Sequence, residues 1–128
     1  MTFAYLDTSA FVKTIVEEPE SDRLAAWLEQ WPARASCTLL RTEAVRALRE
    51  QGPEAIAAAR AGFRTLELVQ LDERLLDAAG DLPGDARSLD AIHVAAALAL
   101  GPDLGALVTY DRRMEAIAGD LGLTVASP

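Results

Sequence analysis

The segment MTFAYLDTSAFVK (residues 1–13) changes its hydrophobic pattern at a single carboxylate, Asp7. Residues 3–6 form a short apolar run that is typical of a buried β-strand. A second apolar pattern starts at Ala10 and predicts a short helix over residues 9–16. Asp7 therefore has two interpretations: it caps the N-terminus of the helix, or it is a functional acid at the end of a strand.

Segments with strand character and segments with helix character alternate along the rest of the chain. Further strands are predicted at residues 34–37, 65–71, 106–109 and 123–125. Further helices are predicted at residues 22–31, 39–51, 54–64, 73–80, 89–100 and 111–119, with Ser21, Thr38 and Ser88 as candidate N-caps. This alternation predicts an α/β fold with a mostly parallel sheet that is covered by helices on both faces.

The composition limits the class of protein. A chain of 128 residues, 51% hydrophobic and 25% charged, fits one globular domain over residues 1–128. No apolar run reaches the about 18 residues of a membrane-spanning helix and no signal-peptide pattern is seen, so we expect no membrane partner. The single cysteine, Cys37, is expected in the core, and a cytoplasmic location fits it. The net charge of −8 argues against a protein that coats nucleic acid through a basic surface.

Four acidic residues lie where an α/β fold places functional groups. Asp7 and Asp111 follow predicted strands, and parallel sheets bind ligands beyond the carboxyl ends of their strands. Glu43 and Asp90 lie near the starts of predicted helices, and the apolar neighbours of Asp90 predict that it is buried and paired. Each has a structural alternative. Asp111 can cap a helix, Asp90 can stabilise a helix dipole, and Glu43 can be a solvated residue paired with an arginine.

Acids gathered from distant segments repel one another unless a cation neutralises them. Mg²⁺ and Mn²⁺ prefer oxygen ligands and retain water molecules, one of which can attack a phosphodiester bond. If the fold brings the four acids together, their chemistry is that of a divalent-metal site.

The same acids occur in four segments with a recognisable order and spacing. These segments are Asp7-Thr8-Ser9-Ala10 after a strand, TEAVRAL (residues 42–48), LDAIHVAA (residues 89–96) and VTYDR (residues 108–112). Together they resemble the PIN-domain family, and the length and order resemble the VapC toxins of bacterial VapBC toxin–antitoxin pairs. The resemblance covers essentially the whole chain, and LDAIHVA is its strongest part.

The resemblance implies a small three-layer α/β/α sandwich and a Mg²⁺- or Mn²⁺-dependent endoribonuclease that hydrolyses RNA phosphodiester bonds. It further implies a homodimer, inhibition by a VapB-like antitoxin protein, and contact with operator DNA only through that antitoxin. Carried over by position, the catalytic and metal-binding acids are Asp7, Glu43, Asp90 and Asp111, with Ser9 and Thr109 as supporting residues.

Two features near these acids have other interpretations. After Asp111 the chain continues Arg112-Arg113-Met114, where many PIN domains carry a further Asp or Asn, so the sequence leaves open whether one or two metals bind. His93, three residues after Asp90, can be a ligand or a base. The alanine-rich helix around it favours a hydrogen-bonded core histidine instead.

Two other α/β classes are disfavoured by single residues. A phosphotransfer receiver domain needs a lysine after a late strand, and the only lysine, Lys13, lies in the first predicted helix. A haloacid-dehalogenase-type phosphatase needs an acid two residues after its nucleophilic Asp, and that position is Ser9. The alternative function is a non-catalytic PIN-fold module that sequesters a protein or RNA partner. Metal-dependent cleavage separates this alternative from a nuclease.

Overall fold

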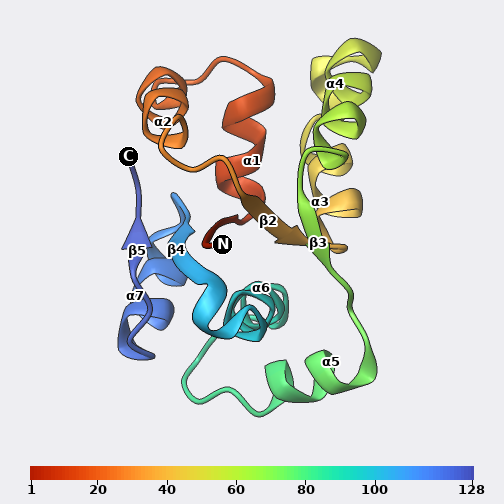
Figure 1. The fold of residues 1–128 in the computed structure, drawn as a ribbon. Coiled ribbons are helices and arrows are strands. Elements are labelled where there is room, and N and C mark those ends of the chain that lie inside the picture. The colour runs from red at the N-terminus through yellow and green to blue at the C-terminus, as the bar shows by residue number, and fades with distance from the viewer.

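Five short strands form one parallel sheet at the centre of the computed structural model, which describes residues 1–128 (Figure 1). The strands are β1 (Phe3–Leu6), β2 (Arg34–Cys37), β3 (Glu67–Val69), β4 (Leu104–Val108) and β5 (Val125–Ala126). They lie in the order β3-β2-β1-β4-β5, and every neighbouring pair is parallel. The predicted α/β class is confirmed, and the sheet is wholly rather than mostly parallel.

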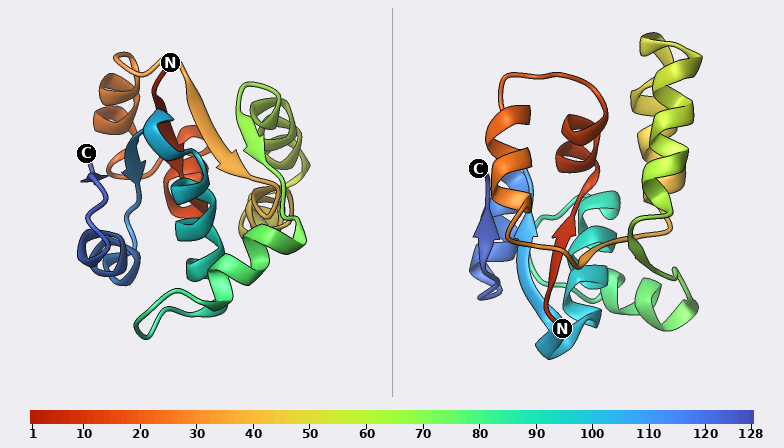
Figure 2. Two further views of the ribbon diagram at one scale, coloured as in Figure 1. Left: turned by 60° about the horizontal axis from the view of Figure 1, so that its bottom comes forward. Right: turned by 45° about the horizontal axis from the view of Figure 1, so that its top comes forward.

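Seven α-helices flank this sheet in two layers (Figures 1 and 2). They are α1 (Thr8–Ile15), α2 (Ser21–Leu28), α3 (Leu40–Ala47), α4 (Pro53–Phe63), α5 (Glu73–Gly80), α6 (Ser88–Ala99) and α7 (Arg112–Asp120), with two 3₁₀ turns, η1 (Arg49–Gln51) and η2 (Gly101–Asp103). Helices α1 to α4 cover one face, and α5, α6 and α7 cover the other. The three-layer α/β/α sandwich is therefore confirmed.

Alternate side chains of β1 supply the two cores on either side of the sheet. Ala4 and Leu6 pack with α1 and α2 on one face, whereas Tyr5 packs with α6 on the other. This follows from the two-residue period of a strand. Burying a large apolar side chain such as Leu6 stabilises the fold by about 1.5–3 kcal/mol. Strand β1 therefore contributes to the cores on both faces of the sheet.

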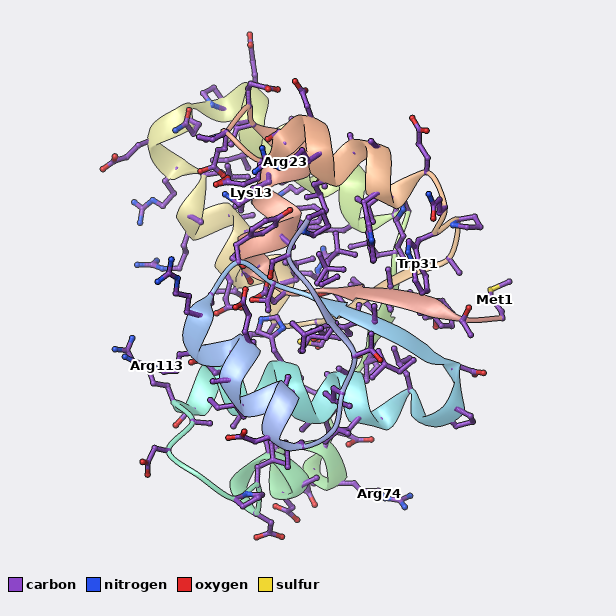
Figure 3. The ribbon with its side chains drawn as sticks, turned by 90° about the vertical axis from the view of Figure 1, so that its left-hand side faces the viewer. Met1, Lys13, Arg23, Trp31, Arg74 and Arg113 are labelled. Atoms are coloured by element: carbon purple, nitrogen blue, oxygen red, sulfur yellow. The ribbon has the colours of Figure 1, made fainter.

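The order of the strands reverses between β1 and β4. From β1 the chain moves outward through β2 to β3, and it then returns to pair β4 with the other edge of β1. In such a sheet the carboxyl ends of the two strands at the reversal border a crevice in which ligands bind. Figure 3 shows Arg113 at this end of the molecule, and Met1 and Trp31 at the opposite end. The fold thus brings the residues after β1 and β4 together.

Three predicted helix caps are wrong, because the hydroxyls concerned have other partners or lie inside the helix. Ser21 is the first residue of α2, and its Oγ bonds the backbone of Lys13 in α1 and of Val16 and Glu18 in the loop that follows α1. Thr38 Oγ1 instead accepts the N–H of Leu71, at 3.3 Å. Ser88 is the first residue of α6 and makes no capping bond.

The other differences from the sequence-based elements are small. The helix predicted over residues 39–51 ends at Ala47 and continues as the 3₁₀ turn η1, and the strand predicted over residues 65–71 shortens to three residues. Cys37 is fully buried in the core, as expected. None of the helices combines the length and the apolar character that a membrane span requires.

Candidate active site

Asp7 ends β1 and starts α1, and the structure confirms that it caps this helix. Its Oδ1 accepts hydrogen bonds from the N–H of Ala10 at 2.9 Å and from Ser9 Oγ at 2.7 Å, and its Oδ2 accepts one from Thr109 Oγ1 at 2.5 Å. The side chain is only 3% exposed. Burial raises the pKa of this carboxyl above its usual value, although the three hydrogen bonds oppose the shift.

The hydroxyls of Ser9 and Thr109 join the turn after β1 to the turn after β4. Ser9 Oγ accepts the N–H of Tyr110 at 3.0 Å, and Thr109 Oγ1 accepts the N–H of Asp111 at 3.1 Å. Both hydroxyls also donate to Asp7. The two supporting residues that the sequence indicated therefore fix Asp7 relative to the backbone of Asp111.

Asp111 is the N-cap of α7. Its Oδ1 accepts the N–H groups of Arg113 at 2.8 Å and of Met114 at 3.3 Å, and its Oδ2 makes no hydrogen bond with the protein. The residue is exposed. Because both capping bonds end on one oxygen, the other is available to a ligand.

Asp90 lies in the first turn of α6 and is close enough to Asp111 for the two charges to interact. Burial and the charge of Asp111 raise the pKa of the Asp90 carboxyl, against the opposing charge of Arg87. No ion pair includes Asp90. The prediction that Asp90 is buried and paired is wrong, because the start of α6 is partly open to solvent.

Glu43 lies in the first turn of α3 and is held by two donors from other helices. Its Oε1 accepts hydrogen bonds from Thr8 Oγ1 at 2.7 Å and from His93 Nε2 at 2.6 Å. Burial acts to raise the pKa of Glu43, but these hydrogen bonds outweigh it and hold the pKa below the usual value. No arginine pairs with this carboxylate, so the solvated, arginine-paired interpretation is wrong.

His93 is a buried, hydrogen-bonded core histidine, as the sequence favoured. Its ring is 3% exposed, and its Nδ1 lies 2.8 Å from the hydroxyl of Tyr5. Although burial disfavours the charged ring, hydrogen bonds to Cys37 and Glu43 raise the pKa of His93 to about 10. Its contact with Glu43 is a feature that sequence reasoning missed, because Glu43 and His93 are 50 residues apart.

The four acids do not form a closed set of ligands. No three histidine, cysteine, aspartate or glutamate side chains are arranged as a ready-made metal site. The donors are nevertheless all carboxylate oxygens, and the pKa of Asp90 stays raised beside Asp111 although the charges of Arg87, His93 and Arg113 oppose the shift. This chemistry fits Mg²⁺ or Mn²⁺, which bind oxygen and retain waters that can bridge to more distant carboxylates.

The chain is similar to known proteins over nearly its whole length. A PIN-domain family model matches residues 4–120. Ribonuclease VapC46 of Mycobacterium tuberculosis is 48% identical over 129 residues, with 100% of this chain and 99% of that protein covered. Ribonuclease VapC35 of the same species is 41% identical, with 97% and 96% covered.

Two solved structures share the fold. The crystal structure of VapC20 from Mycobacterium tuberculosis, a toxin that cleaves the sarcin–ricin loop, has a TM-score of 0.79 at 17% identity and covers 99% of this chain and 100% of its own. VapBC2 from Rickettsia felis, bound to a DNA fragment from its promoter, has a TM-score of 0.74 at 16% identity, with 98% of each chain covered. The sequence matches and the shared fold confirm the family resemblance: the chain belongs to the PIN-domain family and, within it, to the VapC-type toxins.

Proposed function

We propose that this chain is a metal-dependent endoribonuclease, the toxin of a type II toxin–antitoxin pair, in which residues 1–128 act as one PIN domain. Asp7, Glu43, Asp90 and Asp111 hold Mg²⁺ or Mn²⁺ and hydrolyse RNA phosphodiester bonds. The observation that carries the proposal is the Thr109 hydroxyl, which binds both Asp7 and the backbone of Asp111, next to Asp90, whose pKa the charge of Asp111 helps to raise. The names of the related ribonucleases support the substrate class.

The protein groups around the acids have separate tasks. When bound, a divalent ion supplies a water of lowered pKa and neutralises charge on the leaving oxygen. Ser9 and Thr109 hold the Asp7 carboxylate in one orientation, because each donates a hydrogen bond to it. The free Oδ2 of Asp111 faces no protein donor and is the oxygen that this residue offers.

The partners follow from the family. The chain forms a homodimer, and a VapB-like antitoxin protein binds it and connects it to operator DNA. The structure of a VapBC pair on promoter DNA supports this arrangement. A cytoplasmic location fits an enzyme whose substrate is cellular RNA.

The test is cleavage of a mixed cellular RNA pool by purified antitoxin-free protein, in Mg²⁺ or Mn²⁺ and again with EDTA. Discrete fragments that need the metal are expected, and sequencing their ends identifies the cleavage site. Asp90→Asn is expected to abolish cleavage with the fold intact. Asp77→Asn is the matched control, because it removes the same charge from an exposed acid on α5.

The alternative function is a non-catalytic PIN-fold module that sequesters a protein or RNA partner. It predicts that folded protein cleaves no RNA at any metal concentration. Equal cleavage by the wild type and by Asp90→Asn would instead remove Asp90 from the site, or reveal a contaminating nuclease.

A further inference from the structure

We propose that His93 is a positioning residue that fixes the Glu43 carboxylate for metal binding, with Tyr5 and Thr8 completing the arrangement. The proposal rests on the proposed function, because it concerns the same acidic site. His93 itself is not a ligand in this arrangement: both of its ring nitrogens already have protein partners.

Two consecutive side-chain contacts connect Tyr5 in the core, through His93, to Glu43 at the acidic site. The Tyr5 hydroxyl on β1 lies 2.8 Å from His93 Nδ1, and His93 Nε2 donates to Glu43 Oε1 at 2.6 Å. The two rings meet edge to face, with centroids 5.9 Å apart and planes at 77°. A rotation or flip of the imidazole breaks both contacts in a buried environment, where unpaired polar groups are costly. The ring therefore has one orientation.

The same contacts determine which oxygen of Glu43 is available. Thr8 Oγ1 and His93 Nε2 both donate to Oε1, at 2.7 and 2.6 Å, and Oε2 makes no hydrogen bond with the protein. The Glu43 side chain is 21% exposed, against 3% for His93. The two donors thus fix Oε1 in place and leave Oε2 available to a metal ion.

The position of His93 in the fold explains how it links Glu43 to the α5–α7 layer. Helix α6 packs on one face of the sheet and α3 on the other, and the imidazole bridges them beside the carboxyl end of β1. Glu43 has no other contact with the α5–α7 layer among its hydrogen bonds and ion pairs. Without this contact, Glu43 is tied to the site only through Thr8 on α1.

The test compares two variants that replace His93 with an amide side chain, Gln or Asn. The affinity of each RNA-free protein for Mn²⁺ is measured by electron paramagnetic resonance. His93→Gln places an NH₂ donor near the position of Nε2 and reaches Glu43. His93→Asn places its amide near Nδ1, within reach of Tyr5 and Cys37 but not of Glu43. Both variants are uncharged, so any difference between them reports on position rather than on charge.

If His93 positions the Glu43 carboxylate, His93→Asn is expected to weaken Mn²⁺ binding by about 10–100-fold, the range found for residues that orient metal ligands. His93→Gln is expected to recover most of the affinity. Val94→Ala is the control: it opens a cavity at a fully buried neighbour on α6 and does not touch Glu43, so it is expected to lower the melting temperature and to leave Mn²⁺ affinity unchanged.

Several results would overturn the proposal. These are wild-type affinity in a folded His93→Asn protein, equal losses in the Gln and Asn variants, or a comparable loss in Val94→Ala. If His93→Asn does not fold, Tyr5→Phe and Thr8→Val each remove one hydroxyl from the arrangement, and unchanged Mn²⁺ affinity in both contradicts it. A wild-type protein that binds no Mn²⁺ refutes the proposed function itself, which is a different outcome.

Discussion

Thr109 Oγ1 donates a 2.5 Å hydrogen bond to Asp7 Oδ2 and accepts the N–H of Asp111 at 3.1 Å. One fully buried hydroxyl therefore connects the acid that ends β1 to the acid that follows β4. The connection spans 102 residues of sequence between Asp7 and Thr109. It sets the relative position of two of the four candidate acids without help from any bound ion.

The Thr109 hydroxyl is expected to matter for stability and for the site. Thr109→Val keeps the shape of the side chain but removes a hydrogen bond to a buried carboxylate, which costs about 1.5–3 kcal/mol of unfolding free energy. The pKa of Asp7 rises further, because Thr109 opposes the effect of burial. Urea unfolding and Mn²⁺ titration measure the two effects. Thr65→Val, at an exposed hydroxyl that bonds only Gly62 O, is the control and changes neither.

Asp7→Asn is expected to abolish cleavage and, in the metal-free protein, to gain stability relative to the wild type as the pH rises. The folded pKa of Asp7 lies above its reference value of 3.8, so its contribution to stability is fully present below that pH and is lost as the pH rises through the folded pKa. Asn does not titrate. The gain in unfolding free energy over the wild type therefore increases from acid toward neutral pH, in EDTA. A gain that shrinks with rising pH would contradict the raised pKa.

Gly105→Ala is expected to destabilise the fold by about 1–3 kcal/mol, the usual range for overpacking. A Cβ at this position of β4 would lie 2.2 Å from Trp31 Cζ3 and 3.2 Å from Phe3 O. Trp31 is stacked on Trp27, with centroids 5.2 Å apart, so displacing it disturbs this stack. Thermal unfolding followed by tryptophan fluorescence measures the loss. Gly119→Ala in α7, where nothing lies within 4 Å, is expected to stabilise instead.

Arg113 is expected to strengthen binding of RNA at the acidic site. It is exposed, makes no ion pair, and lies two residues after Asp111, where its charge acts on Asp90. Arg113→Gln, made in the Asp90→Asn background, should reduce the salt dependence of RNA affinity by about one phosphate contact. Fluorescence anisotropy with a labelled single-stranded RNA of mixed sequence measures the slope. The control is Arg74→Gln, an exposed arginine on α5 that Figure 3 shows away from Arg113, and equal slopes for the two variants would count against the role.

Local patterns were sufficient for the elements of the fold. The strand over residues 34–37 has the predicted bounds, and the alternation along β1 is enough to assign its two faces. The caps predicted at Ser21 and Thr38 are wrong because a hydroxyl can bond a helix end or another backbone group equally well, here the end of α1 and the following loop for Ser21 and Leu71 for Thr38. The tertiary fold makes that choice, and a short window of sequence does not contain it.

The sequence is sufficient to identify the candidate acids but not the contacts that each of them makes. Asp7 and Asp111 follow strands, which local pattern is enough to place. The bond between Glu43 and His93 joins helices on opposite faces of the sheet, and neither residue carries a local signal of the other. The lack of an ion pair at Asp90 has no local signal either, because the depth of a helix end depends on the packing of the whole layer.

Asp7 caps α1 with the same carboxylate that the proposed chemistry requires. Asn and Ser cap helices about as well as Asp, so a single codon change at this position can silence the nuclease at little cost in folding. A substitution at Asp7 can therefore remove the proposed activity without unfolding the protein. Under the proposed function, a silenced copy that still binds the antitoxin would compete with active copies for it.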